Sequence, residues 1–100
     1  MAKRFNLTPR ALQDLRSIWR YTLDVWGESQ ADRYLSEIYE RIHWLTEHSE
    51  MGTQRPDIGE GYCCFPQGSH LVFYLCSEDA IDVIGILHKQ MDVLHYFDGD

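Results

Sequence analysis

Basic side chains are scarce in this chain of 100 residues. Nine lysines and arginines stand against 16 aspartates and glutamates, which gives a formal net charge of −7. The deficit is largest in residues 51–100, where Arg55 and Lys89 are the two basic residues beside eight acidic ones. Because lysine and arginine contacts to phosphate dominate the affinity of proteins for nucleic acids, we expect no direct binding to DNA or RNA. A basic protein partner fits this charge better.

The chain also lacks the cysteine pattern of a disulfide-bonded or zinc-binding protein. The three cysteines are Cys63, Cys64 and Cys76, an odd number without CxxC spacing, so the sequence predicts neither a disulfide framework nor a zinc site. We expect no metal and no cofactor. Reduced thiols at small apolar strand positions are the expected role, and redox chemistry at Cys63 and Cys64 is the alternative.

The chain also lacks any long apolar run. None approaches the roughly 20 residues that are needed to span a bilayer, and the first residues lack the apolar core of a signal peptide. A hydrophobic fraction of 44% is nevertheless typical of a folded protein. We therefore expect one domain over residues 1–100, in the cytoplasm and without membrane contact.

The second half of the chain contains three short apolar runs, at residues 62–65, 71–76 and 81–87. The segments between them, 66–69 and 77–79, are turn-rich and short enough to reverse the chain directly. This spacing predicts an antiparallel meander of three strands. The third run is too continuously apolar for a strand with one wet face, so we expect it in the sheet interior. Its anomaly is Gly85.

The first half carries the periodicity of two amphipathic helices. Thr8 and Pro9 predict a helix start, because threonine caps free amides and proline has no amide to lose at the first helical position. Gly27 predicts the end of this helix after Trp26. Ser29 is the expected cap of the second helix, and a connection of about three residues would fold the two back as a hairpin.

These elements together predict the fold class. A short alternation at residues 5–7 adds a strand before the helices, and that strand can close the sheet by pairing with a strand of the meander. We expect an α+β fold in which the N-terminal strand and the two-helix hairpin pack on an antiparallel sheet. The last residues, Met91 to Phe97, are apolar enough to lie against another surface.

Several sequence blocks resemble those of a known family. The most specific are GSHLVFY at residues 68–74 and ILHKQMD at residues 86–92, preceded by LQDLRSIWRYT at 12–22 and by Trp26-Gly27. With these blocks in this order, nearly the whole chain resembles the ParE branch of the ParE/RelE toxin superfamily.

The resemblance implies a toxin of a type II toxin-antitoxin system. ParE-like toxins inhibit DNA gyrase by binding it, whereas RelE-like relatives of the same fold cut messenger RNA on the ribosome. We expect a non-enzymatic toxin that binds DNA gyrase and forms a hetero-oligomer with a cognate antitoxin that neutralises it. The alternatives are a ribosome-dependent endoribonuclease and a weakened toxin that retains antitoxin binding alone.

The expected contact residues follow from this assignment. The residues expected to bind the target are His88, Lys89, Met91, Tyr96 and Phe97. The residues expected to bind the antitoxin are Leu12, Ile18, Trp19, Tyr34 and Tyr74. We expect no catalytic residue. A ribonucleolytic site needs several cations around the scissile phosphate, whereas residues 51–100, which form the sheet, contain two lysine or arginine side chains.

Two positions depart from the family pattern. ParE-like sequences usually carry arginine where this chain has Cys63 and Gly85. Neither residue replaces the fixed charge and five donors of a guanidinium. These departures favour the weakened toxin among the three possibilities.

Overall fold

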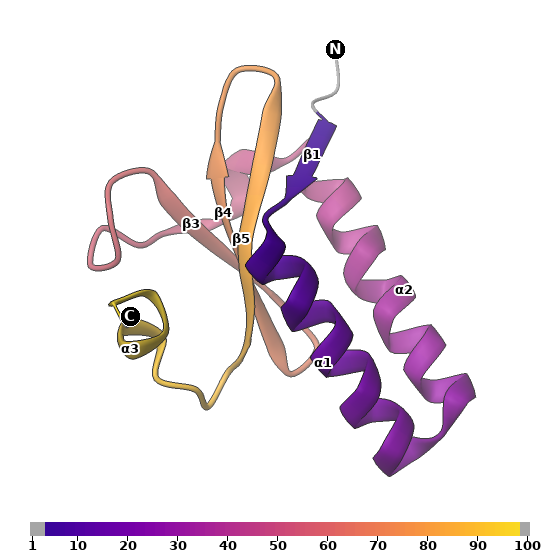
Figure 1. The fold of residues 1–100 in the computed structure, drawn as a ribbon. Coiled ribbons are helices and arrows are strands. Elements are labelled where there is room, and N and C mark those ends of the chain that lie inside the picture. Colours follow the sequence, from indigo (N-terminus) through magenta and orange to yellow (C-terminus); the bar gives the residue numbers. More distant parts are fainter. Residues whose placement is uncertain (1–3, 99–100) are drawn as a thin grey trace.

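The fold is a five-stranded sheet with two long helices across one face and a short helix against the other (Figure 1). The structure is a computed structural model that describes residues 4–98. Its elements are β1 (Arg4–Leu7), α1 (Pro9–Trp26), α2 (Glu28–Leu45), the 3-10 helix η1 (Ser49–Met51), β2 (Thr53–Gln54), β3 (Tyr62–Gln67), β4 (His70–Cys76), β5 (Ala80–His88) and α3 (Val93–Asp98). The predicted α+β class is confirmed.

The strands lie in the order β1-β5-β4-β3-β2. As predicted, β3, β4 and β5 form an antiparallel meander, and β5 is an interior strand because β1 pairs with it in parallel. The two-residue strand β2 pairs with β3 at the far edge and was not predicted, since two residues are too few to show a strand pattern.

One irregularity changes the register between β4 and β5. Phe73 lies opposite Gly85 but Tyr74 lies opposite Val83, so Ile84 is an extra residue in β5. This β-bulge shifts the partner of every β4 residue before Tyr74 by one position.

The start of α1 forms as the sequence predicts. The Thr8 hydroxyl accepts a hydrogen bond of 3.1 Å from the Ala11 amide, and Pro9 is the first helical residue. The helix ends at Trp26 as predicted, but Ser29 is not the cap of α2, which begins at Glu28 with Gly27 before it. Gly27 has a φ of 96°, so this one glycine reverses the chain and replaces the expected three-residue connection.

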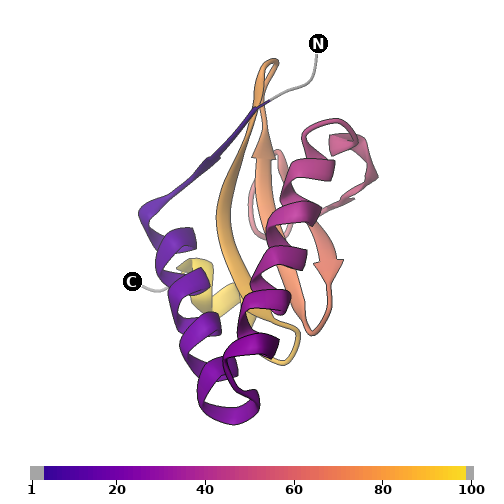
Figure 2. The same ribbon diagram turned by 90° about the vertical axis from the view of Figure 1, so that its right-hand side faces the viewer.

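The main core lies between the helical hairpin and the sheet, and Figure 2 shows both long helices crossing the same face. Its buried apolar residues are Ala11, Leu15, Ile18, Ile38, Ile42, Leu45, Val72, Tyr74, Ile81, Val83 and Ile86. A smaller cluster of Cys64, Phe73, Leu87 and Tyr96 lies on the opposite face. There α3 packs through Tyr96, Val93 and Phe97, as expected for the apolar C-terminal residues.

Candidate functional site

Two histidines meet where β4 begins and β5 ends. His70 and His88 are cross-strand partners, and their ring centroids are 5.3 Å apart in an edge-to-face arrangement. The hydroxyl of Tyr34, from α2, lies 2.6 Å from Nδ1 of His70 and accepts a 3.0 Å hydrogen bond from the Ser69 amide. We call the space beside Tyr34, His70 and His88 the histidine pocket.

The hydrogen bonds around the histidine pocket fix the protonation of its rings. Nδ1 of His88 accepts a 3.1 Å hydrogen bond from the Gln90 amide, so it carries no proton. The pKa of His70 is lowered from 6.5 to about 4 because burial disfavours the charged ring and His88 lies beside it. His70 is therefore uncharged at neutral pH.

The histidine pocket has a volume of about 370 Å³, and its lining within residues 4–98 contains no aspartate, glutamate, lysine or arginine. Tyr21 and Trp26 of α1 form aromatic walls, and no lysine or arginine within residues 4–98 contributes to the lining. Although Lys89 follows His88 in sequence, it lies outside the lining. The arrangement can donate and accept hydrogen bonds, but it offers no cation to a phosphate group.

A second surface feature is a groove along the outer side of the helical hairpin. It has a volume of about 830 Å³, and its apolar lining includes Leu12, Trp19, Leu35 and Tyr39. Its charged residues are Arg16, Arg20 and Asp24. We call it the hairpin groove. Tyr21 lines both the hairpin groove and the histidine pocket, so the two adjoin.

The residues predicted to bind an antitoxin fall into two groups. Leu12 and Trp19 line the hairpin groove, and Tyr34 lines the histidine pocket. Ile18 and Tyr74 are core residues, with 8% and 0% of their surfaces exposed. The Tyr74 hydroxyl donates a 2.7 Å hydrogen bond to the Ser49 carbonyl, and burial raises its pKa. These two residues stabilise the fold and leave almost no surface for a partner in this structure.

The residues predicted to bind the target do not form one surface. Lys89 and Met91 are exposed in the turn after β5, whereas His88 lines the histidine pocket. Tyr96 and Phe97 instead pack α3 onto the sheet, and Tyr96 is 8% exposed. The isolated fold therefore exposes Lys89 and Met91 but covers Tyr96.

The Tyr96 hydroxyl is tied to α1. It donates a 2.6 Å hydrogen bond to Oδ2 of Asp14, which also accepts a 3.0 Å bond from the Ile86 amide. The guanidinium carbon of Arg10 lies 3.5 Å from the centre of the Tyr96 ring. Burial, and next the Asp14 bond, raise the pKa of Tyr96. Sequence reasoning missed Asp14 and Arg10, because their partners lie more than 70 residues away.

Cys63 and Gly85, where the resemblance predicted arginine, lie on opposite faces of the sheet. A Cβ atom at Gly85 would meet the Tyr96 hydroxyl at 2.9 Å, on the face that α3 covers. Cys63 packs against the core beneath the hairpin, and burial raises the pKa of its thiol. Arginines at these positions would therefore not form one cluster.

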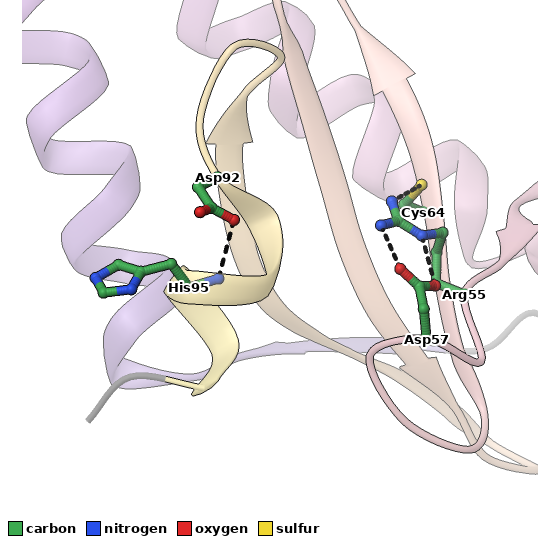
Figure 3. Close-up of polar contacts among 5 residues, drawn as sticks. All are labelled: Arg55, Asp57, Cys64, Asp92 and His95. Carbon is green, nitrogen blue, oxygen red and sulfur yellow. Dashed lines mark hydrogen bonds and ion pairs between the residues drawn. The ribbon is translucent and has the colours of Figure 1, made fainter.

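Arg55 is engaged within its own loop, as Figure 3 shows. Its Nε and one terminal nitrogen donate to the two carboxylate oxygens of Asp57 at 3.0 and 2.9 Å. The guanidinium also approaches the sulfur of Cys64 at 4.0 Å, and the Asp57 bond raises the pKa of Arg55. In the same figure Asp92 caps the start of α3 by accepting the His95 amide at 3.1 Å. Lys89 is thus the basic residue of the second half that remains unpaired within the described chain.

Residues 4–98 contain neither a candidate membrane helix nor a candidate metal cluster. None of the helices there is both long enough and apolar enough to cross a membrane. Within the same residues, no three histidine, cysteine or acidic side chains gather as a metal site would require.

His70 could have been recognised from the GSHLVFY block, but its pairing with His88 depends on the β-bulge.

Comparisons with known proteins agree with this fold. Residues 5–93 match the family described as ParE toxin of type II toxin-antitoxin system, parDE. Toxin ParE1 of Mycobacterium tuberculosis is 38% identical over 94 residues, which cover 93% of this chain and 96% of the relative. Toxin ParE1 of Caulobacter vibrioides is 36% identical, with coverages of 90% and 93%, and Toxin RelE3 of the same organism is 31% identical, with coverages of 87% and 95%.

A solved structure described as the chromosomal ParDE TA system from P. aeruginosa shares the fold. Its TM-score is 0.73 at 18% identity, and the match covers 87% of this chain and 96% of that one. The fold, the family match and the relatives all lead to the same assignment. This chain belongs to the ParE toxin family of type II toxin-antitoxin systems.

Proposed function

We propose that this chain is a toxin that inhibits DNA gyrase by binding and is neutralised by a cognate antitoxin in a hetero-oligomer. The observation that carries the proposal is the ParE family match over residues 5–93. Relatives named ParE1 or ParE, at 34 to 38% identity over most of their length, support it. Its site of action would be the cytoplasm, where gyrase works on DNA.

The charge around the histidines supports binding over catalysis. Phosphodiester cleavage needs cations beside the scissile phosphate, and no lysine or arginine of the described residues lines the histidine pocket. Arg55 is already paired with Asp57. The other basic residue of the second half is Lys89, which directly follows His88 in sequence. Because Toxin RelE3 is also a relative, cleavage of messenger RNA is the alternative that an experiment has to separate.

The hairpin groove is the surface that we assign to the antitoxin. Its apolar residues, such as Leu12 and Trp19, would receive an apolar stripe of the antitoxin. Arg16 and Arg20 outnumber Asp24 in this groove, so the local charge favours acidic residues on the partner. The overall charge of −7 suggested a basic partner instead, but a contact responds most strongly to the charges within about a Debye length of it.

The turn after β5 is the surface that we assign to gyrase. Lys89 and Met91 are exposed there and adjoin neither buried cluster. Tyr96 and Phe97 would act indirectly, by holding α3 and the turn in place. A weakened toxin would keep the hairpin groove intact while this turn fails to bind gyrase.

A supercoiling assay with purified gyrase tests the proposal, run beside a translation assay that detects cleaved message. Inhibition of supercoiling by the full chain without cleavage is the expected result, with recovery when antitoxin is added. Lys89→Ala should weaken inhibition by about ten-fold if it contributes about 1.4 kcal/mol. Glu78→Ala, in the exposed turn between β4 and β5, is the matched control. Cleaved message without an effect on gyrase would refute the proposal, and antitoxin binding with neither activity would indicate the weakened toxin.

A further inference from the structure

Each ring of the histidine pocket has one nitrogen without a partner. The Nδ1 atoms of His70 and His88 are hydrogen-bonded, to the Tyr34 hydroxyl and the Gln90 amide. Within residues 4–98, no side chain or backbone group bonds either Nε2 atom. The pocket therefore has two unused hydrogen-bonding positions.

Both unused nitrogens carry a proton and are donors. In His88, Nδ1 accepts the Gln90 amide, which places the ring proton on Nε2. The Tyr34 hydroxyl oxygen accepts a hydrogen bond from the Ser69 amide. The hydroxyl proton remains free to be donated, and Nδ1 of His70 accepts it in a hydrogen bond. That bond likewise places the ring proton of His70 on Nε2. A protonated Nε2 cannot coordinate a metal ion, so the pocket favours a hydrogen-bond acceptor.

The acceptor atoms that Thr22, Gln30 and Ser69 bring to the pocket lining bond neither Nε2 atom in this structure. No acidic side chain within the described residues lines the pocket, and its walls are the exposed rings of Tyr21 and Trp26. A volume of about 370 Å³ accommodates a side chain that enters between these rings. Such a side chain would have to bring its own acceptor atoms.

The neighbouring surface indicates which acceptor. Tyr21 joins the pocket to the hairpin groove, where Arg16 and Arg20 favour acidic residues. A carboxylate has two oxygens that can accept the two Nε2–H donors. Hydrogen bonds to a charged acceptor are roughly twice as strong as neutral ones, which favours carboxylate over carboxamide.

We propose that the histidine pocket is a receptor site for an aspartate or glutamate side chain of the antitoxin segment that fills the hairpin groove. This inference rests on the antitoxin partner proposed above. His70 is the ring that can gain a proton, because the Tyr34 hydroxyl can then reverse its role and accept a hydrogen bond from Nδ1–H.

The site also predicts proton uptake on binding. The titratable groups around His70 are Tyr21 from α1, Tyr34 from α2 and His88 from β5, and no aspartate or glutamate of the described residues lines the pocket. An incoming carboxylate would raise the pKa of His70 from its value of about 4, because a nearby negative charge favours the protonated ring. Binding should therefore tighten as the pH falls from about 7 to about 5.5.

A small aromatic carboxylate tests the pocket without any antitoxin. Phenylacetate and its neutral isostere phenylacetamide are titrated into the full chain while the imidazole nitrogens are followed by NMR. We expect phenylacetate to shift the Nε2 signals of His70 and His88 and to bind at least about ten-fold more tightly than the amide. His70→Gln should abolish this preference, whereas His43→Gln, on the exposed side of α2, should keep it. Equal binding of the two probes, or shifts outside the pocket, would overturn the proposal.

The cognate antitoxin tests the same site in the complex. Its affinity for His70→Gln should be at least about ten-fold weaker than for His43→Gln, with both variants shown by circular dichroism to be folded. Equal affinities would overturn the inference and leave the proposed function intact. If the antitoxin fails to bind the unaltered chain, the proposed function fails, and the phenylacetate experiment still decides whether the pocket accepts a carboxylate.

Discussion

Gly85 offers the sharpest test of how α3 is held on the sheet. Its φ is not positive, so its backbone does not require glycine. The surrounding space does require glycine, because a Cβ atom at this position would lie 2.9 Å from the Tyr96 hydroxyl, 3.1 Å from its ring and 3.2 Å from Leu87. An alanine there would push the Tyr96 ring away from the sheet and from Asp14.

The expected effect of Gly85→Ala is a balance of three contributions. Alanine in a strand gains about 0.5 to 1 kcal/mol over glycine. Overpacking costs about 1 to 3 kcal/mol, and a weakened hydrogen bond from Tyr96 to the Asp14 carboxylate costs up to about 1.5 to 3 kcal/mol. We expect a net loss of about 1 to 3 kcal/mol in the free energy of unfolding. Gly85→Arg, which introduces the residue that the resemblance predicted at this position, should displace α3 as well.

Chemical denaturation of a double-mutant cycle with Tyr96→Ala checks this reasoning. Without the Tyr96 ring, Gly85→Ala should cost little or even stabilise the chain, because the contact is gone and the propensity gain remains. Leu87→Ala is a less suitable partner, since it opens a cavity in the same cluster. If Gly85→Ala is neutral or stabilising in the unaltered chain, or costs as much without Tyr96 as with it, the steric explanation is wrong.

Two further predictions concern backbone conformation and pH. Gly27→Ala should destabilise the chain by about 1 kcal/mol, because a φ of 96° strains any residue with a Cβ. No atom lies within 4 Å of that Cβ, so a second mutation should not rescue it, and rescue would contradict a purely conformational cost. The pKa of His70 is about 4 in the folded chain and 6.5 in the unfolded one, so the unfolded chain binds more protons between these values and stability falls as the pH falls through this window. His70→Gln should reduce that loss by an amount on the order of 1 kcal/mol, below the full linkage value because the ring is partly exposed to solvent, and parallel pH profiles of denaturation would contradict the assignment.

Local signals in the sequence determined the element order and the family. Thr8 and Pro9 start a helix through atoms within four residues of one another, and Gly27 stops it, so neighbouring residues suffice to predict both ends. The meander followed from short turns between apolar runs, and the continuous apolarity of β5 placed it in the sheet interior. The GSHLVFY and ILHKQMD blocks indicated the ParE family before any tertiary contact was known.

The tertiary structure alone decided which residues meet at the candidate surfaces. The extra residue Ile84 places His70 opposite His88, whereas an unbroken register would place it opposite Leu87. A bulge is a local break in a ladder between distant segments, and the sequence pattern contains no signal for it. Likewise, only the packed structure shows that the Tyr96 hydroxyl occupies the space above Gly85. Sequence periodicity predicts which residues share a face, but packing between elements determines which of those residues meet.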